Sequence, residues 1–351
     1  MVTIEEVAKH CGVSAMTVSR VINNRDNVKE ETKQKVRRAI AELNYRPNLL
    51  AKGLVTGRTK TIAHVVVNIS NLFHPRVIQG VEDACYEKGY NVILCNANNK
   101  HKETEYINII SDKYIDGFIF HHLNINSKQA YELENKGIKC VLIDNEKPLD
   151  ICPNVITDNE LGGYLAAKHL IELGHEKIGI IHGALQINEA IADKGYEETF
   201  QFNIWNKRLE GCLKAFREHG IAIKPEYMAE GRGEADFSID SGYAAMQSIL
   251  SRIDLPTAIY TQNDLMAIGA LRAIMESGYG IPRDFSIIGH DGIDLCKSIY
   301  PQLTSIEQPR YQMGYLSAQL LIDQIESNRK KENIILKPSL AVRQTTARLG
   351  N

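Results

Sequence analysis

The 351-residue chain lacks any uninterrupted apolar run close to the ~20 residues that a membrane-spanning helix needs. Its opening, MVTIEEVAKH, carries two glutamates and no long apolar stretch, so a secretory signal is not expected. The seven cysteines are scattered and never spaced as Cys-x-x-Cys. That pattern argues against a disulfide framework or a zinc cluster and favours free thiols in a reducing cytosol, with Cys85, Cys95 and Cys140 as small buried hydrophobic residues. We therefore expect a cytoplasmic protein with no membrane partner.

The chain also lacks a basic excess, because its formal net charge is −2. This total hides an asymmetry. Residues 1–60 contain twelve Lys/Arg and six Asp/Glu, a net charge of +6, so the remainder carries −8. A basic leading segment on an acidic body indicates that the two parts meet different partners.

The leading segment has the pattern of three short helices. A helix after Ser14, a good N-cap, turns Val18, Val21 and Ile22 inward. Gly12 stands before it, where a sharp turn needs a left-handed backbone. An earlier helix has an apolar stripe of Ile4, Val7, Ala8 and Cys11, and residues 30–43 form a third, buried through Val36, Ala39, Ile40 and Leu43. This is the arrangement of a helix-turn-helix unit, and a small bundle that binds nothing is the alternative.

VTIEEVAKHCGVSAMTVSRVINN, followed by LNYRPNLLAKGL, resembles the headpiece and hinge of the lactose/galactose-repressor family of bacterial transcription factors. The match is dense over residues 2–55. The resemblance implies that Ala15, Met16 and Arg20 read base edges, with Arg20 donating to a guanine and the apolar pair contacting thymine methyls. It also implies a set of phosphate contacts: Thr3, Ser14, Thr17, Ser19, Asn23 and Tyr45. The headpiece spans residues 1–46.

Residues 47–58 are the expected hinge. Pro47 suits a first helical position, and Leu50 and Leu54 lie four apart on one face. The segment 47–55 is too short for a stable isolated helix, for which ~12–15 residues are needed. We expect it to be unfolded in the free protein and helical on DNA, with Asn48, Ala51 and Leu54 at the minor groove and Leu54 as the family's wedge. A plain linker is the alternative.

From Ile62 onward, short apolar runs such as IAHVVVNI and GFIFH alternate with helical patterns. This rhythm predicts an α/β core of two doubly wound parallel-sheet lobes over residues 59–351, with a cleft at the carboxyl ends of the strands. Such a body resembles the periplasmic sugar-binding-protein fold that the same family carries. The resemblance implies three crossings between lobes, placed near 156–160, 301–309 and 336–346. The first lobe is then 59–158 with 304–329, and the second 159–303 with 330–351.

No leucine heptads follow the last strand, so we expect a two-fold homodimer on a palindromic double-stranded DNA operator.

The effector positions implied by the resemblance are mostly polar residues that follow strands. Asp144 and Asp291 stand directly at strand ends, while Asp264 can equally be a helix cap. Carboxylates with an arginine suit vicinal hydroxyls, and an aromatic ring suits the apolar face of a pyranose, so a sugar or glycoside is expected. The full set is Asn71, Phe73, Asp144, Arg208, Phe237, Asn263 and Asp291.

The sequence departs from the family between Gly183 and Arg208, where family members have a shorter loop. Residues 184–207 are either a surface loop or a lid that lays Tyr196, Phe202 or Trp205 across the cleft. The insertion also leaves Lys207 or Lys194 as alternatives to Arg208.

No nucleophile elbow, phosphate-binding glycine loop or metal-spaced set appears, although His121-His122, His182 and His290 lie near strand ends. We therefore expect no catalytic residue, metal or cofactor. The sequence predicts a DNA-binding regulator, most simply a repressor, of carbohydrate-utilisation genes under allosteric control by the effector. A body that responds to a purine or a partner protein is the alternative, and an enzyme domain behind a headpiece is a remote one.

Overall fold

The computed structural model describes residues 2–23, 28–45, 58–97, 102, 105–107, 115–123, 125–145, 149, 151–183, 200–231, 238–327 and 332–350. The chain divides into two compact units, Met1–Lys60 and Thr61–Asn351. The predicted hinge residues Asn48, Ala51 and Leu54 lie outside the described residues, as do Lys194, Tyr196 and Phe237. Within the described ranges, no helix has both the length and the apolarity that crossing a bilayer demands.

The first unit contains the three predicted helices: α1 (Ile4–Cys11), α2 (Ala15–Ile22) and α3 (Glu30–Glu42). Helix α1 ends at Gly12, whose φ of 62° is the predicted left-handed turn. Helix α2 begins where Ser14 Oγ accepts from the Thr17 amide, which confirms Ser14 as its N-cap. Val7, Val18 and Val36, one from each helix, are fully buried against one another.

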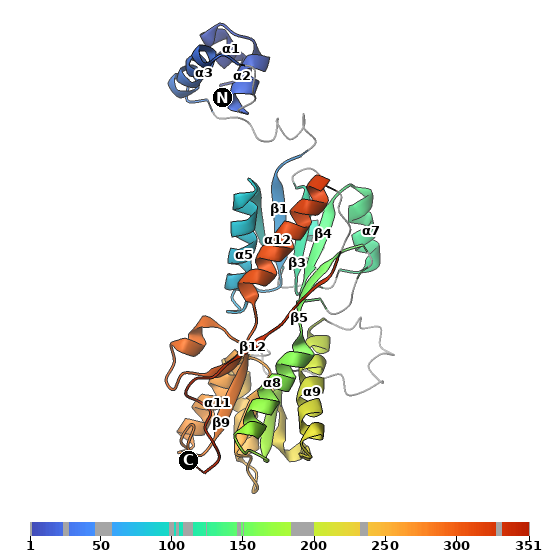
Figure 1. Cartoon of the computed structure of the whole chain (residues 1–351), viewed down its shortest axis with the longest axis vertical. Coiled ribbons are helices and arrows are strands. Elements are labelled where there is room, and N and C mark those ends of the chain that lie inside the picture. The colour runs from blue at the N-terminus through green and yellow to red at the C-terminus, as the bar shows by residue number, and fades with distance from the viewer. Residues whose placement is uncertain are drawn as a thin grey trace. The chain divides into compact units, whose positions relative to one another are not determined.

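The second unit begins with a six-stranded sheet in the order β11-β5-β4-β3-β1-β2. Helices α5 (His74–Glu87) and α12 (Arg310–Ser327) pack side by side on one face, and α7 (Ser127–Asn135) covers the other (Figure 1). All pairings in this sheet are parallel. The strands are β1 (Thr61–Val66), β2 (Asn91–Asn96), β3 (Gly117–His121), β4 (Lys139–Ile143), β5 (Asn154–Thr157) and β11 (Ile334–Leu336).

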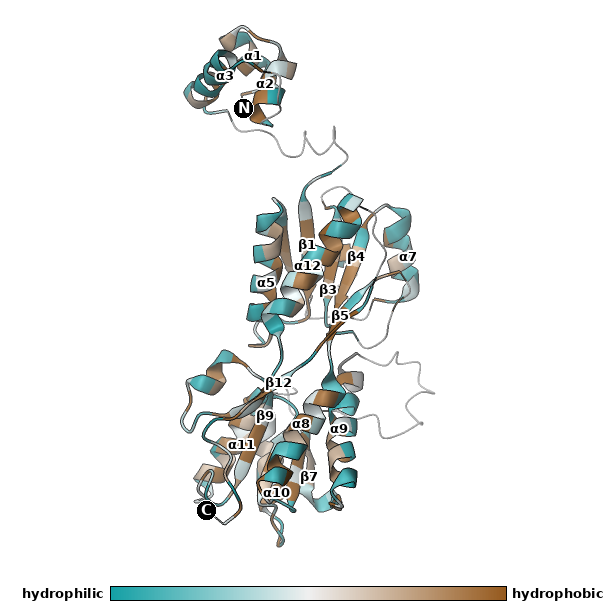
Figure 2. Cartoon of the chain, in the orientation of Figure 1, coloured by the Kyte–Doolittle hydropathy of each residue, from teal (hydrophilic) through white to brown (hydrophobic). Residues whose placement is uncertain are grey.

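Burial on both faces explains why these strands read as continuous apolar runs. In β3, Phe118 and Phe120 face α7, whereas Ile119 faces α5 and α12, and all three are buried. Figure 2 shows the same division, with hydrophobic colour along β1, β3 and β4 and hydrophilic colour on the outer sides of α5 and α7.

A second six-stranded sheet follows, in the order β12-β10-β9-β8-β6-β7. It is parallel except for the antiparallel pair β10 and β12. Helices α8 (Asn159–Glu172) and α9 (Phe200–Glu218) cover one face, and α10 (Ile239–Leu250) and α11 (Asp264–Glu276) cover the other. The strands are β6 (Ile178–His182), β7 (Met228–Glu230), β8 (Ala258–Thr261), β9 (Ser286–Asp291), β10 (Thr304–Glu307) and β12 (Ser339–Ala341); short 3-10 turns are η2 (Pro225–Tyr227) and η3 (Asp294–Lys297).

Glycine sets the distance between α8 and α9. A Cβ atom on Gly163 would overlap the backbone of Arg208, and one on Gly211 would overlap the backbone of Glu160. The two helices therefore meet backbone to backbone. This contact places Arg208 against the sheet.

The two-lobe α/β architecture is confirmed, but two lobe boundaries differ from the prediction. Strand β10 (304–307) belongs to the second sheet and β11 (334–336) to the first, so the first lobe resumes after a crossing at 308–309 and ends before one at 337–338, instead of covering 304–329. Both crossings themselves lie within the predicted ranges 301–309 and 336–346. The second error has a local cause. IILKPSLA reads as one extended stretch, yet Pro338 cannot donate a ladder hydrogen bond, and the chain changes sheets there.

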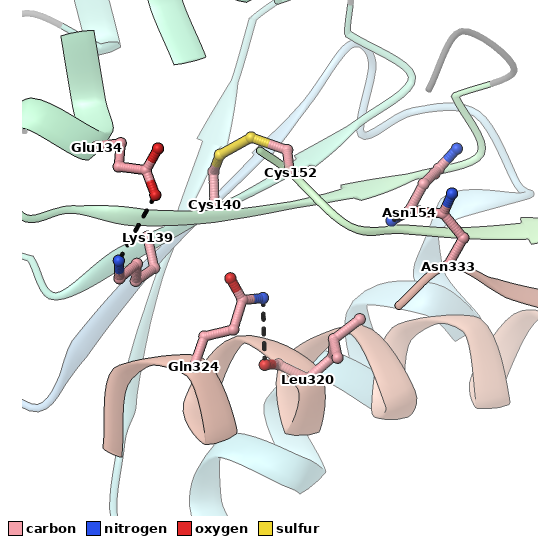
Figure 3. The surroundings of a disulfide bond; sticks show 8 residues. All are labelled: Glu134, Lys139, Cys140, Cys152, Asn154, Leu320, Gln324 and Asn333. Atoms are coloured by element: carbon pink, nitrogen blue, oxygen red, sulfur yellow. Dashed lines mark hydrogen bonds and ion pairs between the residues drawn. A yellow bond between two sulfur atoms is a disulfide. The ribbon is translucent and has the colours of Figure 1, made fainter. Parts of the chain in front are cut away.

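The expectation of seven free thiols is also wrong. Cys140 of β4 and Cys152, just before β5, form a disulfide whose Cα atoms are 5.5 Å apart (Figure 3). Adjacent strands bring the two together, which spacing along the chain does not reveal. The other five cysteines, Cys85 and Cys95 among them, are free and buried, as predicted for small hydrophobic residues.

Candidate functional site

The outward face of α2 carries the residues predicted to read base edges. Met16 is 65% exposed and Arg20 is exposed, while Ala15 packs partly against the headpiece core. The hydroxyls of Ser14 and Thr17 bond to each other at 2.9 Å, and Asn23 Nδ2 donates to the Ser19 carbonyl. None of the nine DNA contacts predicted in the headpiece is fully buried, and the group comprises Thr3, Ser14, Ala15, Met16, Thr17, Ser19, Arg20, Asn23 and Tyr45.

In the first lobe, the predicted residues Phe73 and Asp144 come together through a histidine that sequence reasoning missed. His122 Nε2 lies 2.8 Å from Asp144 Oδ2, and the His122 ring stacks on Phe73 with centroids 5.5 Å apart. His122 and Asp144 each follow a strand directly and have left-handed φ values of 55° and 57°. Such backbone conformations in non-glycine residues concentrate at binding sites, but no sequence pattern announces them.

In the second lobe, Arg208 and Asp291, both predicted effector positions, lie against each other. Arg208 Nη2 is 3.1 Å from Asp291 Oδ1, its Nε donates to Asn159 Oδ1 at 2.9 Å, and it also donates to the Gln262 carbonyl. Lys207 is the one of the two predicted alternatives to Arg208 that lies within the described residues, and it is half-exposed and pairs with Glu210. The structure therefore places Arg208, and not Lys207, beside Asp291.

Asp291 is the last residue of β9 and has a φ of 118°, and it also accepts from Gln308 Nε2 at 2.8 Å. Burial is the largest influence and raises the pKa of this carboxyl, while Arg208 and then Arg310 lower it. Asp144 of the first lobe raises the Asp291 pKa further. The strand-end carboxylates of the two lobes are thus close enough to repel each other.

Three residues that the sequence analysis named near the effector site form hydrogen bonds within their own lobe. Asn71 Oδ1 accepts from the Phe73 amide at 2.9 Å, and Asn263 Oδ1 caps α11 by accepting from the Met266 amide at 2.7 Å. Asp264 is not the helix cap that its position suggested. It is buried and accepts from Ser305 Oγ and the Ile293 amide, and burial, followed by Asp291, raises its pKa to about 7.

Trp205 is not a lid. Its side chain is 7% exposed and packs into the core of the second lobe, where a Cβ on Gly183 would overlap its ring. The Arg208 guanidinium lies 5.2 Å from the centre of the Trp205 ring. The only tryptophan of the chain is therefore part of the wall that supports Arg208.

One arginine spans the two lobes. Arg310, the first residue of α12, donates from Nη1 to the Leu72 carbonyl of the first lobe at 3.3 Å and from Nη2 to the Gly292 carbonyl of the second. Arg310 is buried, as is Gln308 beside it. Both stand in the second crossing, where no strand end drew attention to them.

In the described part of the chain, one group of side chains has the proximity that a metal site requires. His74, His121 and His122 each offer a nitrogen, and these atoms lie within 4.8 Å of one another.

Comparison with known proteins agrees with both units. Residues 3–48 match the model of the lacI family of bacterial regulatory proteins, and residues 167–346 match the periplasmic binding protein-like domain. The chain is 36% identical to the HTH-type transcriptional repressor PurR of Serratia proteamaculans (strain 568), over 99% of this chain and 97% of that protein.

Two solved structures extend the comparison. A lac repressor dimer bound to operator and the anti-inducer ONPF superposes with a TM-score of 0.83 at 27% identity, covering 99% of each chain. The complex of the transcriptional regulator CelR with cellobiose gives 0.71 at 29% identity, covering 98% of this chain and all of that one.

These matches run the length of the chain, and they join a helix-turn-helix headpiece to a two-lobed binding core. The protein is a regulator and not an enzyme. It belongs to the lacI family of DNA-binding bacterial transcriptional regulators.

Proposed function

We propose that this protein is a cytoplasmic transcriptional repressor whose operator affinity is set by a sugar-like effector bound between its two lobes. The observation that carries the proposal is the Arg208–Asp291 pair, which lies at the carboxyl end of β9 and within the electrostatic reach of Asp144. A guanidinium paired with one carboxylate, with a second carboxylate near the first, offers donors and acceptors to adjacent hydroxyls of one small molecule.

The wider site has the same chemistry. Phe73 is buried and stacks beneath His122, so the partly exposed His122 ring is the aromatic surface proposed for the apolar face of a sugar ring, while Gln308 and Asn159 hold the two charged groups in place. The CelR structure is described with cellobiose, a glycoside of the expected class. We infer sugar binding by this chain from the chemistry of the site together with its similarity to the CelR structure.

A purine effector is the second candidate. It is favoured by the similarity to proteins named PurR, which extends over the whole chain. A planar base would use the His122 ring, which Phe73 backs, for stacking and leave the Arg208–Asp291 pair to its polar edge.

The proposed switch acts on the hinge. The lac repressor structure is described as a dimer on its operator. We propose the same assembly here, with two headpieces on a palindromic site and the hinge segments helical only when paired on DNA. An effector that binds one lobe arrangement better than another shifts that equilibrium by its difference in affinity, typically ~1–3 kcal/mol.

Effector class is tested by thermal unfolding of the purified chain with ribose, cellobiose, adenine or guanine. A ligand at ~100 times its Kd adds about 2.7 kcal/mol of stability, which raises Tm by several degrees. We expect a sugar to raise Tm and Asp291→Asn to abolish the shift. Asp284→Asn alters an exposed carboxylate of the same lobe and is expected to leave the shift intact. A response to purines alone would contradict the sugar proposal.

Effector binding is also expected to change tryptophan fluorescence. Trp205 is the only tryptophan, and the Arg208 guanidinium lies over its ring, so a ligand that draws Arg208 toward itself alters the polarity at the indole. The measurement is a fluorescence titration of the full chain, with Trp205→Phe as the silent control. A ligand that raises Tm yet leaves the emission of the native chain unchanged binds somewhere other than at Arg208.

A further inference from the structure

We propose that His74, His121 and His122 form a binding site for a divalent first-row transition-metal ion, with Zn²⁺ as the ion that fits best. The three side chains come from the first turn of α5 and from the end of β3, 47 residues further along. They meet only in the folded first lobe, so no metal-binding spacing exists in the sequence. The site goes beyond the effector proposal, because it needs no sugar or purine to form.

The spacing of two of the rings matches a tetrahedral site. His74 Nδ1 and His121 Nε2 lie 3.3 Å apart. Two nitrogens bound at ~2.0–2.1 Å to a tetrahedral zinc ion are separated by about 3.3–3.4 Å. The third nitrogen, from His122, lies within 4.8 Å of both, so the proposed ion requires this partly buried ring to move closer to the other two. Three histidines leave one position of the ion open.

The rings of His74 and His121 are packed inside the first lobe, where they are 2% and 0% exposed. Burial lowers the pKa of each well below the ordinary histidine value. His64 stacks on His121 with centroids 5.6 Å apart. These two proposed ligands are therefore shielded from solvent.

Asp144 supplies the supporting carboxylate. Its Oδ2 lies 2.8 Å from His122 Nε2, the arrangement in which a carboxylate orients a ligand histidine and raises its basicity. The other oxygen, Oδ1, is buried and has no hydrogen-bond partner in the described structure, and the same is true of His121 Nδ1. Buried polar atoms without partners are rare, and here they border the three rings.

The test is a metal titration of the full chain, prepared without a histidine tag and stripped with a chelator. Zn²⁺ binding is followed by calorimetry, and Co²⁺ serves as a spectroscopic probe. We expect one ion per chain and a tetrahedral Co²⁺ spectrum without a thiolate charge-transfer band, since the free cysteines are buried. His74→Gln and His122→Asn are expected to abolish stoichiometric binding. Asparagine is chosen at residue 122 because it tolerates the left-handed backbone.

Asp144→Asn is expected to weaken metal binding by about 10–100-fold without abolishing it. His219→Gln removes an exposed histidine of the second lobe and is the matched control, with unchanged binding. Circular dichroism confirms that each variant is folded. Absence of one-to-one binding in the wild-type chain, or binding that survives both histidine substitutions, would overturn the proposal and leave His74 and His121 as a simple hydrogen-bonded pair. Either result leaves the effector titration intact, so the two proposals fail separately.

Discussion

Replacing Arg208 by methionine is expected to lower the free energy of unfolding by about 3–5 kcal/mol, the usual result of removing one partner of a buried ion pair. The Arg208 side chain is 4% exposed and that of Asp291 is 14% exposed. Methionine preserves much of the volume but leaves Asp291 with Gln308 as its near donor and removes the partner of the Gln262 carbonyl. Chemical denaturation measures the loss.

The pH dependence of this loss identifies its cause. The folded-state pKa of Asp291 is already raised, and Arg208 opposes the rise, so the variant raises it further. A raised carboxyl pKa contributes stability at low pH that is lost as the pH climbs through the folded value. The deficit of the variant is therefore expected to be larger near about pH 7 than near about pH 5.

Two further variants control the experiment. Adding Asp291→Asn to the methionine variant is expected to recover part of the loss, since the carboxylate left without its guanidinium partner is then removed. Lys207→Met, at the neighbouring half-exposed position, is expected to change stability by no more than about 0.5 kcal/mol. A deficit of equal size at both pH values, with no recovery in the double variant, would assign the effect to packing alone.

Arg20→Ala is expected to weaken binding to a selected palindromic duplex by about 10–100-fold, because a side chain with paired donors to one base contributes ~1–3 kcal/mol of discrimination. Arg20 is exposed on the same face of α2 as Met16. Fluorescence anisotropy against the selected duplex and against one changed at a single guanine measures both affinity and preference.

Arg37→Ala is the control for the loss of one positive charge, because it removes an exposed arginine from α3. We expect this variant to keep the base preference and to bind all duplexes slightly less well, as for a non-specific phosphate contact. If both variants weaken binding equally and neither alters the preference, Arg20 does not read a base.

Local sequence predicted the secondary structure well because its causes are local. Ser14 and Gly12 delimit α2 and α1 by capping and by a left-handed φ, and strands such as Gly117–His121 are apolar on both faces. The two-lobe core followed from the alternation of these elements. The exchange of β10 and β11 between sheets did not, because strands of three or four residues carry too little pattern to show which neighbour they pair with.

The candidate site was predictable where a residue ends a strand and obscure where distant segments meet. Asp144 and Asp291 follow apolar runs and could be chosen from the sequence. His122, Gln308 and Arg310 act through contacts across 17 to 238 residues. The disulfide between Cys140 and Cys152 was missed for the same reason, since strand pairing and not spacing brings the two sulfurs together.

The two strand-end carboxylates impose a condition on movement of the lobes. Asp144 and Asp291 are carboxyl groups on opposite lobes, and repulsion from Asp144 contributes to the raised pKa of Asp291, so any approach of one lobe to the other strengthens that repulsion. A guest molecule rich in hydroxyl donors screens that repulsion from within, whereas dissolved salt acts weakly on charges so little exposed. How closely the two lobes approach is consequently governed by what is held between these groups more than by the ionic strength outside.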